Sequence, residues 1–279
     1  MIAALVGIAI GLVLGLTGAG GSVLAVPLLI FVLKVSPDAA VTFSLAAVFG
    51  SALFGVLTRL RTGEISWIPA LFFAAGGMLF APLGVFLSGY FSDSWRLVSF
   101  TVLMLIIAAR MFWQSINAPT FSRVLRAGGE KDVASNGPMC PLSDSSQFEM
   151  RFSCIALLAS GGAVTGILSG VYGVGGGFLI VPILTIITQL SMGQAVATSL
   201  LVISLISGSG FVSYVVGEGL EQFSGNWMFP LLMAGALAGM FIGTLLSRKL
   251  AGPRLQQVFV LAIVAMAGFT IWNLDSVPG

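Results

Sequence analysis

Two glycine clusters, 155 residues apart, interrupt apolar runs of this chain and are the features best suited to binding chemistry. The segment Gly15–Leu45 aligns without a gap with Gly170–Leu200, and 13 of the 31 aligned positions are identical. Each segment carries the pattern Gly-x-Gly-Gly-x-x-x-x-x-Pro, which begins at Gly18 in the first and at Gly173 in the second. The chain is therefore two copies of one unit. Paired, glycine-broken hydrophobic segments indicate the substrate site of a transporter.

Backbone at such a break can bind an anion without a charged side chain. Non-helical backbone inside a bilayer is tolerated only where it is buried in protein or lines a cavity. We expect new helices to begin near Ser22 and Gly177, where unpaired N–H groups carry about half a positive charge. Glycine lets an anion approach these groups because it has no Cβ. Two inverted copies would direct two such helix starts at one point near the membrane midplane.

Hydroxyl groups close to the breaks add candidate hydrogen-bond donors. Ser44 and Ser199 occupy matching positions in the two copies, and Tyr172 at the second break either closes over a ligand or packs. Serine hydroxyls also bond to helix carbonyls for local reasons, and the alternative explanation of the glycines is tight helix crossing. The predicted substrate-binding residues are Gly18, Gly20, Gly21, Ser22, Ser44, Tyr172, Gly175, Gly176, Gly177, Thr198 and Ser199.

Charged residues that could carry other chemistry are scarce. The chain has no histidine, and no Asp or Glu lies deep in an apolar block. The sequence therefore offers no catalytic dyad, proton relay or metal-ligand set, and we expect no enzymatic activity, metal or cofactor. Arg59 and Arg61 form the expected cytoplasmic mouth, where they fix the topology or attract an anion. A nucleotide phosphate loop at Gly18–Ser22 is disfavoured because its flanks are not short soluble strands.

The elements that must position these residues are apolar blocks. The chain is 57% hydrophobic and 8% charged, whereas soluble domains carry about 25% charged residues. We predict an all-α polytopic membrane protein with blocks at 2–33, 39–58, 66–90, 95–113, 153–188, 192–216, 227–247 and 255–273. The predicted domains are a first membrane repeat at 1–117, a polar cytoplasmic linker at 118–151 and a second membrane repeat at 152–279.

The first block of each copy is too long for one crossing, and we expect the glycines to split it into pieces of about 15 and 12 residues. The two pieces either cross twice or dip into the membrane and return. Basic residues favour the cytoplasmic side. Arg59, the linker and the Arg248–Arg254 loop can all lie inside only if the glycine-split first block crosses the membrane an even number of times. The two repeats are then inverted. With two crossings per split block the total is about ten, with both termini outside.

Other small residues have packing roles in this interpretation. Glycines at small-residue spacing let membrane helices approach closely, and they include Gly76, Gly77, Gly84, Gly235, Gly239 and Gly243. The two cysteines, Cys140 and Cys154, form no disulfide framework, and we expect free thiols.

The sequence resembles the sulfite exporter TauE/SafE family of membrane permeases. The resemblance is carried by the doubled Gly-x-Gly-Gly-x-x-x-x-x-Pro pattern, by Ala197-Thr-Ser-Leu200 and by Arg59-Leu-Arg-Thr-Gly-Glu-Ile-Ser-Trp67. It covers nearly the whole chain outside about 118–150. The long linker departs from the family pattern. So does Thr42-Phe-Ser44 in the first copy, where the second copy has Ala197-Thr-Ser.

The resemblance implies movement of a small sulfur-containing anion, such as sulfite or an organosulfonate, across the bacterial cytoplasmic membrane. We therefore expect a secondary transporter with alternating access at the glycine breaks. The name of the family favours export as the direction of transport. The alternatives are an anion channel and a carrier for another small carboxylate or inorganic anion. The expected partners are a small anionic substrate and the lipid bilayer, without nucleic acid. The sequence leaves the coupling ion (H⁺ or Na⁺) and the oligomeric state open.

Overall fold

Apolar helices make up the described part of this chain. The computed structural model describes residues 1–18, 21–60, 63–117, 152–188, 190, 192–218, 227–250, 264 and 268. The predicted linker and most of the last apolar block lie outside these residues. The helices are α1 (Ile2–Thr17), α2 (Gly21–Leu33), α3 (Pro37–Arg59), α4 (Trp67–Ser88), α5 (Asp93–Asn117), α7 (Phe152–Tyr172), α8 (Gly177–Ile187), α9 (Met192–Glu218) and α10 (Met228–Leu250).

Five of the described helices are long and apolar enough to cross a membrane: α3, α4, α7, α9 and α10. The outer face of α4 is suited to lipid, because its side chains Leu71, Leu79 and Phe86 are each more than 60% exposed. Large apolar side chains exposed in this way are stable against lipid, not water. The chain is thus a multi-pass helical membrane protein, as the composition predicts.

Each of the two long apolar blocks that contain a glycine cluster is split into two helices, as predicted. The first block forms α1 with 16 residues and α2 with 13. The second forms α7 with 21 residues and α8 with 11. At about 1.5 Å per residue, α2 and α8 span roughly 20 and 17 Å, which is less than a hydrocarbon core of about 30 Å. Neither α2 nor α8 is long enough for a full crossing, so these lengths do not support two full crossings per split block.

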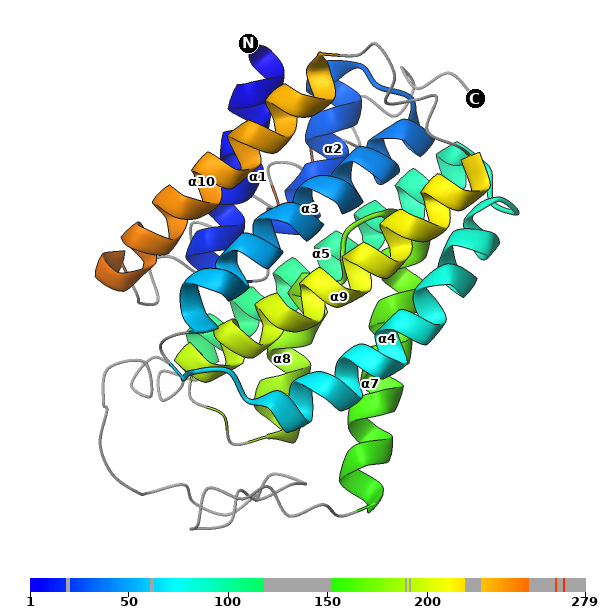
Figure 1. Ribbon diagram of the computed structural model, residues 1–279. Coiled ribbons are helices and arrows are strands. Elements are labelled where there is room, and N and C mark those ends of the chain that lie inside the picture. Colours follow the sequence, from blue (N-terminus) through cyan, green and yellow to red (C-terminus); the bar gives the residue numbers. More distant parts are fainter. Residues whose placement is uncertain are drawn as a thin grey trace.

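The helix that opens each repeat packs against a late helix of the other repeat. Helix α1 lies beside α10, and α7 lies beside α4 (Figure 1). Glycines form both contacts at backbone distance, as the small-residue spacing predicts. A Cβ on Gly7, Gly11 or Gly15 would collide with the backbone at Leu232, Ala236 or Met240, and one on Gly162, Gly166 or Gly170 would collide with the backbone at Phe73, Gly77 or Ala81. Both series rise together along the chain, so both helix pairs are parallel.

The helices α3 and α9, which occupy matching positions in the two repeats, cross the centre of the molecule in opposite directions (Figure 1). A Cβ on Gly55 would lie 3.2 Å from Leu200, and a Cβ on Gly210 would lie 3.3 Å from Leu45. The early part of each helix therefore faces the late part of the other. This antiparallel centre holds both glycine breaks close to the middle of the fold.

The expectation of free thiols is wrong for Cys154. This residue is buried near the start of α7 and is disulfide-bonded. The other cysteine, Cys140, lies outside the described residues. Spacing along the chain could not predict the bond, because disulfide formation depends on Cα and Cβ separations in three dimensions.

Candidate functional site

The first glycine break ends α1 in a left-handed turn. Gly18 has φ 70° and ψ 0°, and its N–H donates to the Leu14 carbonyl at 2.7 Å. A Cβ at Gly18 would collide with the side chain of Val196 on α9. Helix α2 then begins at Gly21, one residue before the predicted start. Gly21 and Ser22 are buried, whereas Gly20 lies outside the described residues.

The second break contains three glycines in left-handed backbone. Gly173, Gly175 and Gly176 have φ of 69°, 66° and 63°, values at which a side chain would be strained. Helix α8 begins at Gly177, as predicted, and no side chain caps it. All of Gly173 to Gly177 is buried. A buried, uncapped helix start leaves first-turn N–H groups available to an anion.

Two serines join each break to the opposite repeat. Ser44 on α3 donates its hydroxyl to the carbonyl of Gly173 at 2.7 Å. Ser199 on α9 lies 3.0 Å from the carbonyl of Gly18, and it shares its proton with the carbonyl of Val196 at 2.9 Å. The two contacts are equivalent under the 155-residue offset. While these bonds persist, both serines offer a ligand their lone pairs and not their protons.

The remaining predicted hydroxyls face different neighbours. Thr198 is fully buried, and its Oγ1 accepts the N–H of Ser66 at 3.1 Å, immediately before α4. The ring of Tyr172 packs on Phe100 with ring centroids 5.6 Å apart. The structure thus gathers Gly18, Ser199, Gly173 and Ser44 into crossed contacts, and it points the Thr198 oxygen towards the start of α4.

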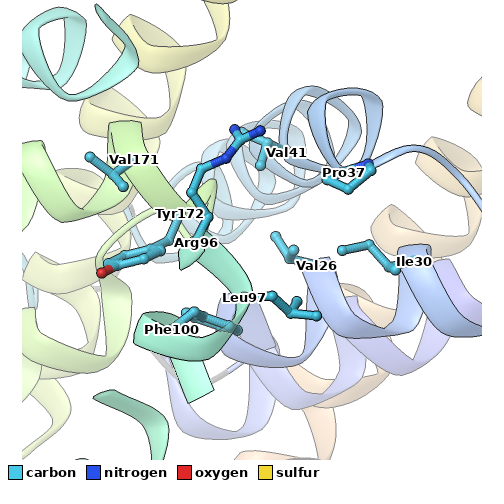
Figure 2. Close-up of a pocket in the computed structure, with 9 residues that line it drawn as sticks. All are labelled: Val26, Ile30, Pro37, Val41, Arg96, Leu97, Phe100, Val171 and Tyr172. Carbon is cyan, nitrogen blue, oxygen red and sulfur yellow. The ribbon is translucent and has the colours of Figure 1, made fainter. Parts of the chain in front are cut away.

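A pocket beside the second break contains a cation that the sequence analysis missed. Its lining joins α2, α3 and α5 to Val171 and Tyr172, and Arg96 is its charged member (Figure 2). The Arg96 side chain is only 11% exposed, and it donates to Asp38 at 2.8 Å. Arg96 lies near the start of α5, so this largely buried charge is placed towards one face of the membrane and not at its centre. Its place inside the predicted block 95–113 was the signal that could have identified it.

A second ion pair lies at the other end of α3. Arg59 is 3.7 Å from Glu64, and its side chain is 12% exposed. Arg61 lies outside the described residues. Arg59 and Asp38 stand at opposite ends of the 23-residue α3, so the two ion pairs belong to opposite faces of a membrane-spanning protein. Among the described residues, no cluster of His, Cys, Asp or Glu could hold a metal ion.

Multi-pass helices, buried glycine breaks and a cation beside one of them define a protein of the membrane transporter class. The family model for sulfite exporter TauE/SafE matches residues 3–270, and the chain belongs to this family. It is a transporter family, so the protein is not an enzyme.

The similar curated proteins are all described as probable membrane transporters. One from Xylella fastidiosa (strain Temecula1 / ATCC 700964) is 32% identical over 268 residues, which cover 95% of this chain and 92% of the relative. One from Bacillus subtilis (strain 168) is 25% identical over 273 residues, covering 95% and 94%. One from Methanocaldococcus jannaschii is 26% identical over 274 residues, covering 95% and 92%. No solved structure matches the chain.

Proposed function

We propose that this protein is a secondary transporter that exports a small sulfur-containing oxyanion, such as sulfite or an organosulfonate, across the bacterial cytoplasmic membrane. The family name supports the substrate class. The observation that carries the proposal is the buried start of α8, which has left-handed glycines and no side-chain cap. Such a helix end stabilises negative charge through its N–H groups and its dipole.

The architecture we propose is a pair of inverted repeats, at 1–117 and 152–279, with the linker between them inside and both termini outside. Three contacts support it: α3 runs antiparallel to α9, α1 runs parallel to α10, and α7 runs parallel to α4. Inverted repeats place a substrate site at their interface, near the membrane midplane. Helix α2 would run from its break towards one side of the membrane, and α8 would run from its break towards the other.

Alternating access then requires parts that move as units. The pairs α1–α10 and α4–α7 are each locked by backbone-to-backbone glycine contacts. We propose that they rock about the α3–α9 centre, where the crossed serine bonds hold the breaks. The pocket at Arg96 and Tyr172 (Figure 2) lies between the second break and the side of the membrane opposite Arg59, where an exported anion would be released.

The test combines binding and transport by the purified full-length protein. A bound ligand raises apparent stability, so sulfite, sulfate, thiosulfate, sulfoacetate and acetate are screened by thermal shift. The bound anion is then assayed in proteoliposomes for counterflow, which a carrier supports and a channel does not. Stabilisation by sulfite or sulfoacetate with counterflow is expected. No stabilisation by any anion would refute the proposal, and rapid flux without counterflow would favour the channel.

A further inference from the structure

The two glycine breaks occupy matching positions in the sequence but have different neighbours on the adjoining helices. Around the first break, α1 and α3 contribute Ile10, Leu14 and Ala52, all fully buried. The residues 155 positions later are Thr165, Ser169 and Ser207, also fully buried. Three apolar positions of the first repeat therefore carry hydroxyl groups in the second.

Ser207 on α9 faces the second break directly. A Cβ built on Gly175 would lie 2.5 Å from the Ser207 hydroxyl oxygen, 3.0 Å from Val48 and 3.7 Å from Ile203. The absence of a side chain at Gly175 thus leaves the hydroxyl against the backbone that leads into α8. Ala52, the matching residue of the first repeat, has no such group.

Ser169 belongs to the face of α7 that packs on the same turn. The Thr165 carbonyl lies 3.0 Å from a Cβ built on Gly176, and Ser169 is four residues further along that face. In the first repeat, the matching Leu14 lies 2.6 Å from a Cβ built on Gly21. Ser169 occupies the position in the second repeat that Leu14 occupies beside the start of α2 in the first.

The hydroxyls of Ser169 and Ser207 have no hydrogen-bond partner in the protein, although both are fully buried. Neighbouring hydroxyls do have one: Thr165 donates to Gly161 or Gly162, and Ser204 donates to Leu201. Leaving a buried hydroxyl unpaired costs about 1–3 kcal/mol. Two such groups beside one uncapped helix start indicate a ligand that accepts hydrogen bonds.

The carbonyls at the end of α7 indicate an anion and not a cation. A coupling cation would need free carbonyl oxygens there. The Ser169 carbonyl accepts the Gly173 N–H at 2.8 Å, the Gly170 carbonyl accepts the Tyr214 hydroxyl at 3.3 Å, and the Gly173 carbonyl accepts Ser44. These three carbonyls are therefore already engaged, whereas the hydroxyls of Ser169 and Ser207 have no partner in the protein and can donate to an anion.

We propose that the transported oxyanion binds at the second break. Ser169 and Ser207 donate to its oxygens together with N–H groups at the start of α8, whereas the matching positions of the first repeat, Leu14 and Ala52, are apolar. This inference rests on the proposed function and locates its site. It puts the site in the second repeat, next to Tyr172 and the Arg96 pocket.

The experiment uses the full-length protein and substitutions that copy or mimic the first repeat. Ser207→Ala installs the first-repeat residue, Ser169→Ala removes the other hydroxyl, and Ser204→Ala removes a buried hydroxyl that has an internal partner. Sulfite and sulfoacetate are titrated by thermal shift, in Na⁺ and in choline buffers. We expect Ser207→Ala and Ser169→Ala each to weaken binding roughly tenfold or more. Their unfolding temperature without anion stays unchanged or rises, and Ser204→Ala binds like wild type.

The outcomes separate this inference from the proposed function. Wild-type protein that binds neither anion refutes the proposed function, and with it this site. Wild-type binding that survives both Ser169→Ala and Ser207→Ala refutes only the location. Loss of Na⁺ dependence in these variants, with unchanged anion affinity, would assign the hydroxyls to a cation and also overturn the inference.

Discussion

The hydroxyl of Ser44 donates to the carbonyl of Gly173 at 2.7 Å, across 129 residues of sequence. Ser199 makes the equivalent contact with Gly18 at 3.0 Å. Each break is thus held by a serine of the other repeat, so the breaks cannot move independently of α3 and α9. This coupling links the conformation of each break to the position of a central helix of the opposite repeat.

The first prediction concerns this crossed contact. Ser44→Ala leaves a buried carbonyl without its side-chain donor, so we expect a loss of about 1–3 kcal/mol in stability. Thermal unfolding in detergent measures it. The matched control is Ser51→Ala on the same helix, whose hydroxyl donates to Ala47 four residues earlier. That carbonyl keeps its helical N–H partner, and an equally large loss in the control would show that the crossed bond has no special role.

The repeat, the helix breaks and the starts of α2 and α8 could be predicted from the sequence. These features depend on local properties: glycines that stop a helix, and apolar runs too long for one span. The matching serines could also be identified, because Ser44 and Ser199 share the 155-residue offset. Their partners could not, since each bond joins segments that meet only in the folded protein.

The Arg96 pocket and the hydroxyls of Ser169 and Ser207 illustrate what local patterns miss. Arg96 is stabilised by Asp38, 58 residues away, and no spacing rule connects them. Ser169 looks like an ordinary helix serine until its lack of a partner is seen in three dimensions. The aligned segments begin at Gly15 and end at Leu45, so they excluded Leu14 and Ala52, whose comparison reveals the asymmetry.

The second prediction concerns the α4–α7 contact. A Cβ on Gly166 would collide with the carbonyl of Gly77, so Gly166→Ala forces the two helices apart. Overpacking of this kind costs about 1–3 kcal/mol, and we expect a lower unfolding temperature and a lower yield of folded protein. Gly217→Ala is the control, because nothing lies within 4 Å of its Cβ position. There the change is neutral or stabilising by up to about 1 kcal/mol.

The third prediction concerns the attraction between Arg96 and an anion on its side of the membrane. Arg96→Gln removes the pocket's cation, and we expect a several-fold fall in the transport kcat/KM for sulfite, larger at low ionic strength because salt screens the attraction. Uptake into proteoliposomes at 20 and 300 mM salt, about a fourfold change in Debye length, measures it. Lys34→Gln removes an exposed charge near the same end of α3 without touching the pocket. If both variants lose activity equally, the effect belongs to net charge and not to Arg96.

The last prediction fixes the orientation in the membrane. In a Cys140→Ser, Cys154→Ser background, a cysteine at Gln222 should react with a membrane-impermeant maleimide in intact cells. A cysteine at Ser145, in the linker, should react only after permeabilisation, because basic loops stay inside.

The disulfide at Cys154 makes this measurement decisive. The cytosol keeps thiols reduced, so a lasting disulfide is expected on the outer side of the membrane. Labelling at Ser145 in intact cells, without labelling at Gln222, would place the linker outside and reverse the orientation. The Arg96 pocket would then face the cytoplasm, and the substrate would meet that cation at the start of export. Labelling at Gln222 in intact cells, with Ser145 labelled only after permeabilisation, would instead place the linker inside. The disulfide at Cys154 would then be transient in the cell, and Arg96 would lie on the side where the anion is released.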